Sequence, residues 1–137
     1  MKYKRAEVSL EAVAFFSSVG IQCYDIIPPI ESNVYCVKDK DSQWAAFRIG
    51  DSHPIVPFGK YNYMWGYDKG YCLVSVTDEY KIAFANRGII DAKGNEIIKP
   101  YTFRDIFNFY GKGNSHVLVL THDGTPMNIP IVSLKLL

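Results

Sequence analysis

The chain has few of the features that mark several large protein classes. Its three cysteines, Cys23, Cys36 and Cys72, show no Cys-x-x-Cys spacing. An odd count without paired spacing argues against both a disulfide framework and a zinc knuckle. A reducing compartment is therefore the simpler setting, and we expect neither a metal nor a cofactor.

An excess of charge of one sign is also missing. Fifteen basic residues balance fourteen acidic ones, and the charged runs are short and mixed. Binding to nucleic acid or to an anionic membrane usually requires a basic patch, so neither partner is expected. No apolar run is long enough to span a bilayer.

A short apolar stretch at residues 12–16 follows basic residues, as in a secretory signal. Glu7 and Glu11 interrupt the approach to this stretch, and Gln22 is a poor residue for a cleavage site. The pattern favours a cytoplasmic protein. Export is the alternative, if residues 1–22 form a signal segment.

Aromatic and turn residues, by contrast, are abundant. The chain holds ten Tyr, eight Phe and two Trp, and Tyr and Phe are favoured in half-buried strands. Apolar runs alternate with Gly- and Asp-containing turns that suit tight hairpins. They predict strands at 34–37, 44–49, 71–76, 81–85, 88–91, 96–98, 116–120 and 129–132, whereas 102–109 fits either a strand or a turn of helix.

One helix is predicted, at the N-terminus. Ser9 is a favourable N-cap and Gly20 ends the apolar periodicity. The prolines at positions 28 and 29 then separate this helix from the strands. Its apolar face would consist of Leu10, Val13, Phe16 and Val19.

A block that pairs a turn residue with a Pro six positions later recurs at 51–57, 94–100 and 124–130. A single shift along the chain also places 44–76 on 87–119. Internal repetition of this kind indicates stacked units. We therefore predict one domain, residues 1–137, with a mainly β fold of antiparallel hairpin repeats. Residues 1–20 would form a helical cap over an open sheet end.

The middle unit carries a recognisable order of residues: Gly88-Ile89-Ile90-Asp91, Gly94, Ile97-Ile98, Pro100, Phe103, Asp105, Phe109, Gly113 and Val117. It resembles the bacterial WG-repeat family, whose unit begins with Trp-Gly. Arg87 replaces that Trp in the middle unit, Trp44-Ala45 stand at the pair upstream, and 123–130 is a fragment. The resemblance covers about residues 42–132. It implies β-rich modules without a common catalytic residue set and with a leaning toward binding.

His116, His122 and Asp123 are of residue types common in catalysis. In a strand the two histidines would lie about 20 Å apart at ~3.3 Å per residue, too far to share a metal. The sequence His122-Asp123-Gly124 is typical of a hairpin turn. Cys72 has no neighbouring His to activate it and fits a buried strand. We expect no catalytic residue, and a small hydrolase using His116, His122 and Asp123 is a lesser alternative.

Aromatic and polar residues alternate at 61–68, within a long predicted connection. Its aromatic rings could offer contact area to a partner, or every second ring could fill the core. The sequence thus predicts a non-catalytic binding or protein-interaction module, with a carbohydrate-binding module as the alternative. It also predicts that Trp44 is buried and that Trp65→Ala costs at most about 1 kcal/mol. The predicted binding residues are Tyr61, Tyr63, Trp65 and Tyr67.

Overall fold

A computed structural model describes residues 8–76 and 86–134. Within these residues the protein is mainly β, with ten strands in three antiparallel sheets and one nine-residue helix near the N-terminus. This confirms the predicted fold class. The strand predicted at 81–85 lies outside the described residues. In chain order the elements are α1 (Leu10–Ser18), β1 (Asp25–Ile27), β2 (Val34–Lys38), β3 (Trp44–Arg48), β4 (Tyr63–Asp68), β5 (Tyr71–Ser75), β6 (Arg87–Asp91), β7 (Glu96–Ile98), β8 (Asp105–Tyr110), β9 (His116–Leu120), β10 (Pro126–Pro130) and α2 (Ile131–Leu134).

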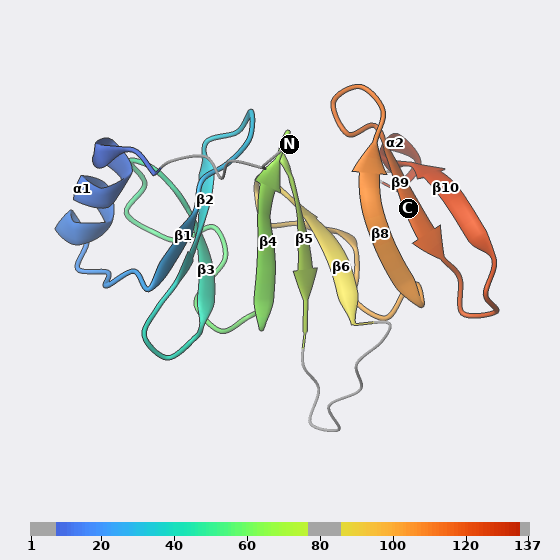
Figure 1. The fold of residues 1–137 in the computed structure, drawn as a ribbon, viewed down its shortest axis with the longest axis horizontal. Helices are drawn as coiled ribbons and strands as arrows, with labels where there is room; N and C mark the ends of the chain where they lie inside the picture. The colour runs from blue at the N-terminus through green and yellow to red at the C-terminus, as the bar shows by residue number, and fades with distance from the viewer. Residues whose placement is uncertain (1–7, 77–85, 135–137) are drawn as a thin grey trace, which may run out of the picture.

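The sheets follow one another along the long axis of the molecule in sequence order (Figure 1). The first sheet is β1-β2-β3, the second is β4-β5-β6-β7 and the third is β8-β9-β10. Each sheet therefore contains three consecutive strands paired as an antiparallel meander. This meander is the repeating unit of the fold.

The pairing register shows that the three meanders are built alike. In each one, the last residue of the second strand pairs with the first residue of the third strand, and these first residues are Trp44, Arg87 and Pro126. The sequence shift that placed Trp44 on Arg87 is thus a structural equivalence. The recurring block at 124–130, however, lies in the hairpin from β9 to β10, whereas the blocks at 51–57 and 94–100 follow a third strand.

Three hairpin turns share one set of hydrogen bonds. A side-chain oxygen of the first residue accepts from the N–H of the fifth, at 2.9, 2.9 and 3.0 Å. The fourth residue has a positive φ of 61°, 83° or 90°, as a type I turn with a left-handed bulge residue requires. The Asp-Gly turn predicted from the sequence is among them. The turns are Asp39 to Gln43, Asp91 to Asn95 and Thr121 to Thr125.

Helix α1 covers the outer face of the first sheet (Figure 1). Ser9 caps it as predicted, and its hydroxyl oxygen accepts from the N–H of Ala12 at 3.1 Å. Ala12 and Phe16 are the buried residues of the helix, and the Phe16 ring centroid lies 5.7 Å from that of Phe47. The predicted apolar face was therefore mostly wrong, because the helix contacts the sheet through Ala12 and Phe16, with Phe15 packed beside them. Leu10, Val13 and Val19 are exposed.

Two further cores fill the spaces between sheets. One lies between the first and second sheets and includes Trp44, which is buried as predicted, with Met64 and Val74. The other lies between the second and third sheets and includes Ile89 and Val119. The middle sheet therefore buries both of its faces, which explains its continuous apolar runs.

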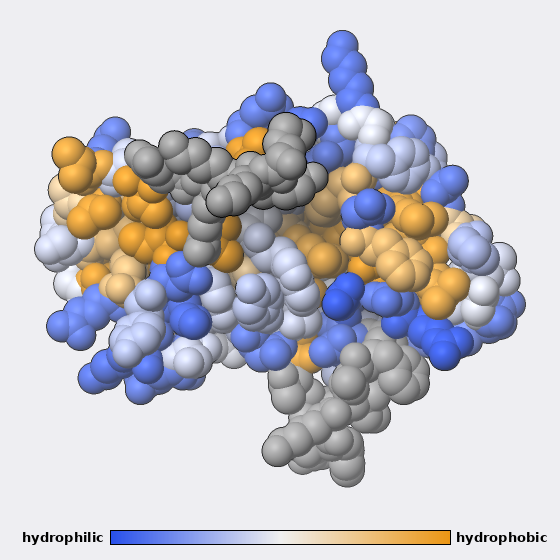
Figure 2. Space-filling view, in the orientation of Figure 1, coloured by the Kyte–Doolittle hydropathy of each residue, from blue (hydrophilic) through white to orange (hydrophobic). Residues whose placement is uncertain are grey.

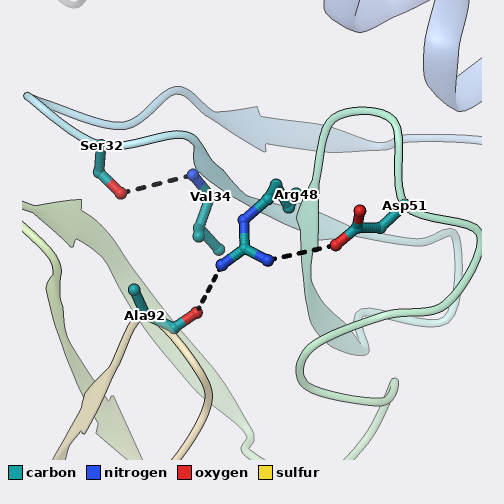
Figure 3. Close-up of polar contacts among 5 residues, drawn as sticks. All are labelled: Ser32, Val34, Arg48, Asp51 and Ala92. Atoms are coloured by element: carbon teal, nitrogen blue, oxygen red, sulfur yellow. Dashed lines mark hydrogen bonds and ion pairs between the residues drawn. The ribbon is translucent and has the colours of Figure 1, made fainter.

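Arg48 links the first two sheets at the end of β3 (Figure 3). Its guanidinium donates to the Asp51 carboxylate at 3.3 Å and to the Ala92 carbonyl oxygen at 3.4 Å. Nearby, the N–H of Val34 donates to the Ser32 hydroxyl oxygen at 3.4 Å. Because the Arg48 and Asp51 side chains are part exposed, this ion pair stabilises the junction only modestly.

Candidate binding groove

The aromatic stretch at 61–68 is not a connection, because its residues from Tyr63 onward form strand β4. A bulge between Met64 and Tyr67 shifts the register, so these two side chains point inward although they are three residues apart. An alternating pattern cannot reveal such a strand, since the bulge and Gly66 interrupt it. The bulge decides which rings remain available to a partner.

Tyr61 and Tyr67 are core residues, each 1% exposed. The Tyr61 hydroxyl donates to the Glu96 carboxylate at 3.0 Å, and the Tyr67 hydroxyl donates to the Asp91 carbonyl oxygen at 2.7 Å. Burial raises the pKa of both tyrosines above its usual value. Both rings are buried, so these two members of the predicted site do not offer the exposed aromatic surface expected of them.

Tyr63 and Trp65 lie on the exposed side of β4, and each is 41% exposed. Their ring centroids are 4.6 Å apart with an interplanar angle of 65°. This edge-to-face contact favours the orientation of Trp65 seen in the structure. The two rings do not form a flat platform.

These rings belong to a continuous series of contacts, which we call the aromatic ladder. Trp44 lies 5.2 Å from Tyr63, and the guanidinium of Arg87 lies 5.1 Å from the ring centroid of Trp65. Arg87 also forms an ion pair with Asp105 at 3.3 Å. Trp44 and Arg87 therefore have the same role at successive junctions, because each contacts the first residue of the next unit. Trp44 contacts Tyr63 through an aromatic pair, and Arg87 contacts Asp105 through an ion pair.

A groove of about 330 Å³ lies beside Trp65, where β4 and β8 and the chain that follows β1 come together. Phe107, which is 47% exposed, also lines it. Apolar surface gathers over β8 in Figure 2. The lining residues are Ile27, Pro28, Ile30, Trp65, Gly66, Tyr67, Asp68, Leu73, Ile106, Phe107, Asn108 and Phe109.

The backbone shapes the wall of this groove at Gly66 and Ile30. Gly66 has a φ of +106°, and a Cβ there would lie 2.6 Å from Cγ2 of Ile27, so only glycine permits this approach. The N–H of Ile30 donates to the Tyr67 carbonyl oxygen at 3.0 Å, and the Ile30 carbonyl accepts from the N–H of Lys69 at 2.8 Å. These bonds fix the chain after β1 against the end of β4.

Asp68 is the acidic residue of the groove. Its backbone carbonyl accepts from the Asn114 amide at 2.9 Å. Its side-chain atom Oδ1 is buried and has no hydrogen-bond partner among the described residues. A buried carboxylate oxygen without a partner is costly, so this atom marks an unmet requirement for a donor.

Of the histidines predicted as alternative catalytic residues, His116 begins β9 and His122 lies in the turn after that strand. The His116 ring stacks on Tyr110 at 5.3 Å, and its Nδ1 is 2.9 Å from the Ser115 hydroxyl. Nε2 of His122 donates to the Tyr101 carbonyl oxygen at 2.9 Å. Each ring is therefore engaged locally, and the structure does not bring the two together.

Asp123 and Cys72 are also placed apart. The Asp123 carboxylate accepts from the Thr121 hydroxyl, which holds its pKa below the usual value. Cys72 is fully buried between the first two sheets, and its Sγ lies 3.9 Å from Sγ of Cys36. The contact with Cys72, together with burial, raises the pKa of Cys36 well above normal, so this thiol stays protonated.

The described residues contain neither a metal site nor a membrane-spanning helix. Among residues 8–76 and 86–134, no group of three His, Cys, Asp or Glu side chains could hold a metal ion. The helices found in the same residues are too short to cross a membrane.

The sequence predicts Trp65 as a binding residue, but it does not place Phe107, Ile30 and Asp68 beside it in one groove. The internal shift contained a signal, because it places 106–110 on 63–67 and so puts β8 in the role of β4. Nothing in the sequence indicates that Ile30 lines the groove. Its place there depends on the chain after β1 pairing with β4, which no local pattern predicts.

Fold and groove together define a β-repeat protein with an apolar groove along the first strands of its units. No known family model matches the chain, and no curated protein matches it. A solved structure with some likeness is the crystal structure of the computationally designed Ika4 protein, with a TM-score of 0.39 and 14% identity. The match covers 72% of this chain and 61% of that one. A likeness at this level carries no argument about fold or function.

Proposed function

We propose that the protein is a non-catalytic interaction module of the bacterial WG-repeat type, acting in the cytoplasm and binding a protein partner at the groove. The observation that supports this most is the position of Trp65. It lies where the aromatic ladder meets the groove, partly exposed and held by Tyr63 and Arg87. Aromatic side chains fixed in this way contribute strongly to protein interfaces, because little side-chain entropy is lost on binding.

The dimensions of the groove favour the insertion of a few side chains. Its volume of about 330 Å³ lies at the small end of the range for ligand pockets. A partner would therefore place one or two residues between Trp65 and Phe107 and make weaker contacts around them. Such an interface has a small energetic centre with a polar rim.

A carbohydrate is the second candidate for this surface. Carbohydrate stacking would need two coplanar exposed rings, whereas Tyr63 and Trp65 are inclined by 65° and Tyr61 and Tyr67 are buried. The geometry favours a protein partner for this reason.

Site-specific photocrosslinking in cells tests the proposal. A photoreactive phenylalanine at position 65 should give a discrete protein adduct that mass spectrometry can identify. The same residue at position 24 is the matched control, because Tyr24 is an exposed aromatic, at 76%, outside the groove lining. Identical adducts at both positions, or no protein adduct at position 65, would refute the proposal, and a glycan adduct at position 65 would favour the carbohydrate alternative.

A further inference from the structure

We propose that the groove recognises an extended peptide that presents an Arg or Lys side chain between apolar residues. This inference rests on the proposed function and specifies the chemistry of its partner. It joins two observations about one surface: an acidic residue with an unpartnered oxygen, and aromatic walls that are part exposed.

Asp68 gives the groove a negatively charged residue. Oδ1 of Asp68 is buried without a partner, and the side chain forms no ion pair with any described residue. Because Oδ1 is closed to solvent, a cation in the groove would stabilise the Asp68 carboxylate through its charge, without a hydrogen bond to that atom. An acidic ligand would instead add a second uncompensated charge.

The walls of the groove suit the rest of such a side chain. Trp65 and Phe107 can pack on the aliphatic stem of Arg or Lys, and their faces attract a cation. The protein already contains one example of this contact, because the Arg87 guanidinium lies over the Trp65 ring. Arg87 does not repel a second cation strongly, since its own charge is paired with Asp105 at 3.3 Å.

The elements around the groove favour an extended ligand. β8 is an edge strand of the third sheet and pairs with β9 alone. An extended segment running beside this edge would place alternate side chains toward the groove. Ile27 and Ile30 then offer apolar contacts to the neighbours of the basic residue.

Three blocked tripeptides test the charge requirement: acetyl-Ile-Arg-Ile-amide and its Gln and Glu counterparts. Each is titrated into the full chain at up to millimolar concentration, and the indole N–H resonance of Trp65 is followed by NMR. We expect the Arg peptide to bind at least tenfold more tightly than the Gln peptide and the Glu peptide to bind most weakly. The affinity of the Arg peptide should also fall as salt is added, whereas that of the Gln peptide should not.

Variants then locate the effect. Asp68→Asn should bring the Arg and Gln affinities within about twofold of each other, whereas Asp41→Asn, an exposed acid in a distant turn, should preserve the difference. Trp65→Ala should weaken binding of all three peptides, which is measured by isothermal titration calorimetry because this variant lacks the indole that reports binding in the wild type. If Asp68→Asn does not fold, Asp68→Glu keeps the carboxylate and should keep the preference for Arg.

The outcomes separate this inference from the proposed function. Equal binding of the Arg and Gln peptides, or tighter binding of the Glu peptide, would overturn the basic-residue assignment while leaving a peptide-binding groove. The assignment is also overturned if no peptide shifts Trp65 but crosslinking at position 65 still captures a protein. Absence of both signals would remove the interaction module as well.

Discussion

Replacing each of the two tryptophans by Ala compares the stability lost at a buried ring, Trp44, with that lost at a partly exposed ring, Trp65. Trp44 is 2% exposed and packs in the core between the first and second sheets. Loss of a buried Trp side chain costs about 3–5 kcal/mol, because the cavity that remains collapses only in part. That is a large share of the roughly 5–15 kcal/mol by which a domain of this size is stable.

Trp65→Ala should cost less, because part of this ring is already in water. Its contact with Tyr63 is worth about 0.5–1.5 kcal/mol and that with Arg87 about 0.5–1 kcal/mol. We therefore expect a loss of about 1–2.5 kcal/mol, somewhat more than the sequence alone predicted. The difference arises because sequence could not show that Trp65 has two partners.

Urea unfolding followed by far-UV circular dichroism measures both losses without relying on the tryptophans themselves. Acrylamide quenching of the single-Trp variants Trp44→Phe and Trp65→Phe gives an independent measure of access. The remaining Trp65 should be quenched readily and the remaining Trp44 weakly. Equal free-energy losses together with equal quenching would refute the assignment of one ring to the core and the other to the surface.

Three further changes probe the packing. Gly88→Ala should destabilise by about 2 kcal/mol or more in urea unfolding, because a Cβ there would lie 2.6 Å from the Ile98 carbonyl oxygen; a loss below about 0.5 kcal/mol would contradict this close approach. Phe16→Ala should cost about 3 kcal/mol by the same measurement, and a neutral result would mean that α1 does not cover the first sheet in solution. Tyr67→Phe should cost about 1 kcal/mol at neutral pH through the lost bond to Asp91. The raised pKa of Tyr67 lets the folded state keep a proton that the unfolded state loses, so wild-type stability should fall as the pH rises above about 10. The Tyr67→Phe variant should show a shallower fall. An equal slope in the two proteins would refute the contribution of Tyr67 to this pH dependence.

The turns and the helix start could be predicted from sequence because their causes are local. The Ser9 cap and the Asp91 turn each depend on hydrogen bonds within four residues. Strand β4 could not be predicted in the same way, since its bulge puts Met64 and Tyr67 on one side. The predicted strand at 129–132 was correct only for its first two residues, since β10 ends at Pro130 and α2 begins at Ile131.

Only part of the candidate site could be predicted from the sequence, and the reason is different from that for β4. Alternation does predict that some rings of the 61–68 stretch face inward, but it does not say which ones. Trp65 lines the groove because residues from β8 and from the chain after β1 lie opposite it. Such long-range proximity is a property of how the units stack, and the internal repeat was its only trace in the sequence.

The two buried faces of the middle sheet give the stack a direction. On β5, Cys72 and Val74 face the preceding sheet, whereas Tyr71 and Leu73 face the following one. Helix α1 occupies the place of a preceding sheet for the first unit. Every junction is thus head-to-tail, and at each one the first strand of a unit contacts the sheet that precedes it. Inserting a unit would therefore lengthen the stack and add a further junction, and under the proposed function the valency of binding would grow with the number of repeats.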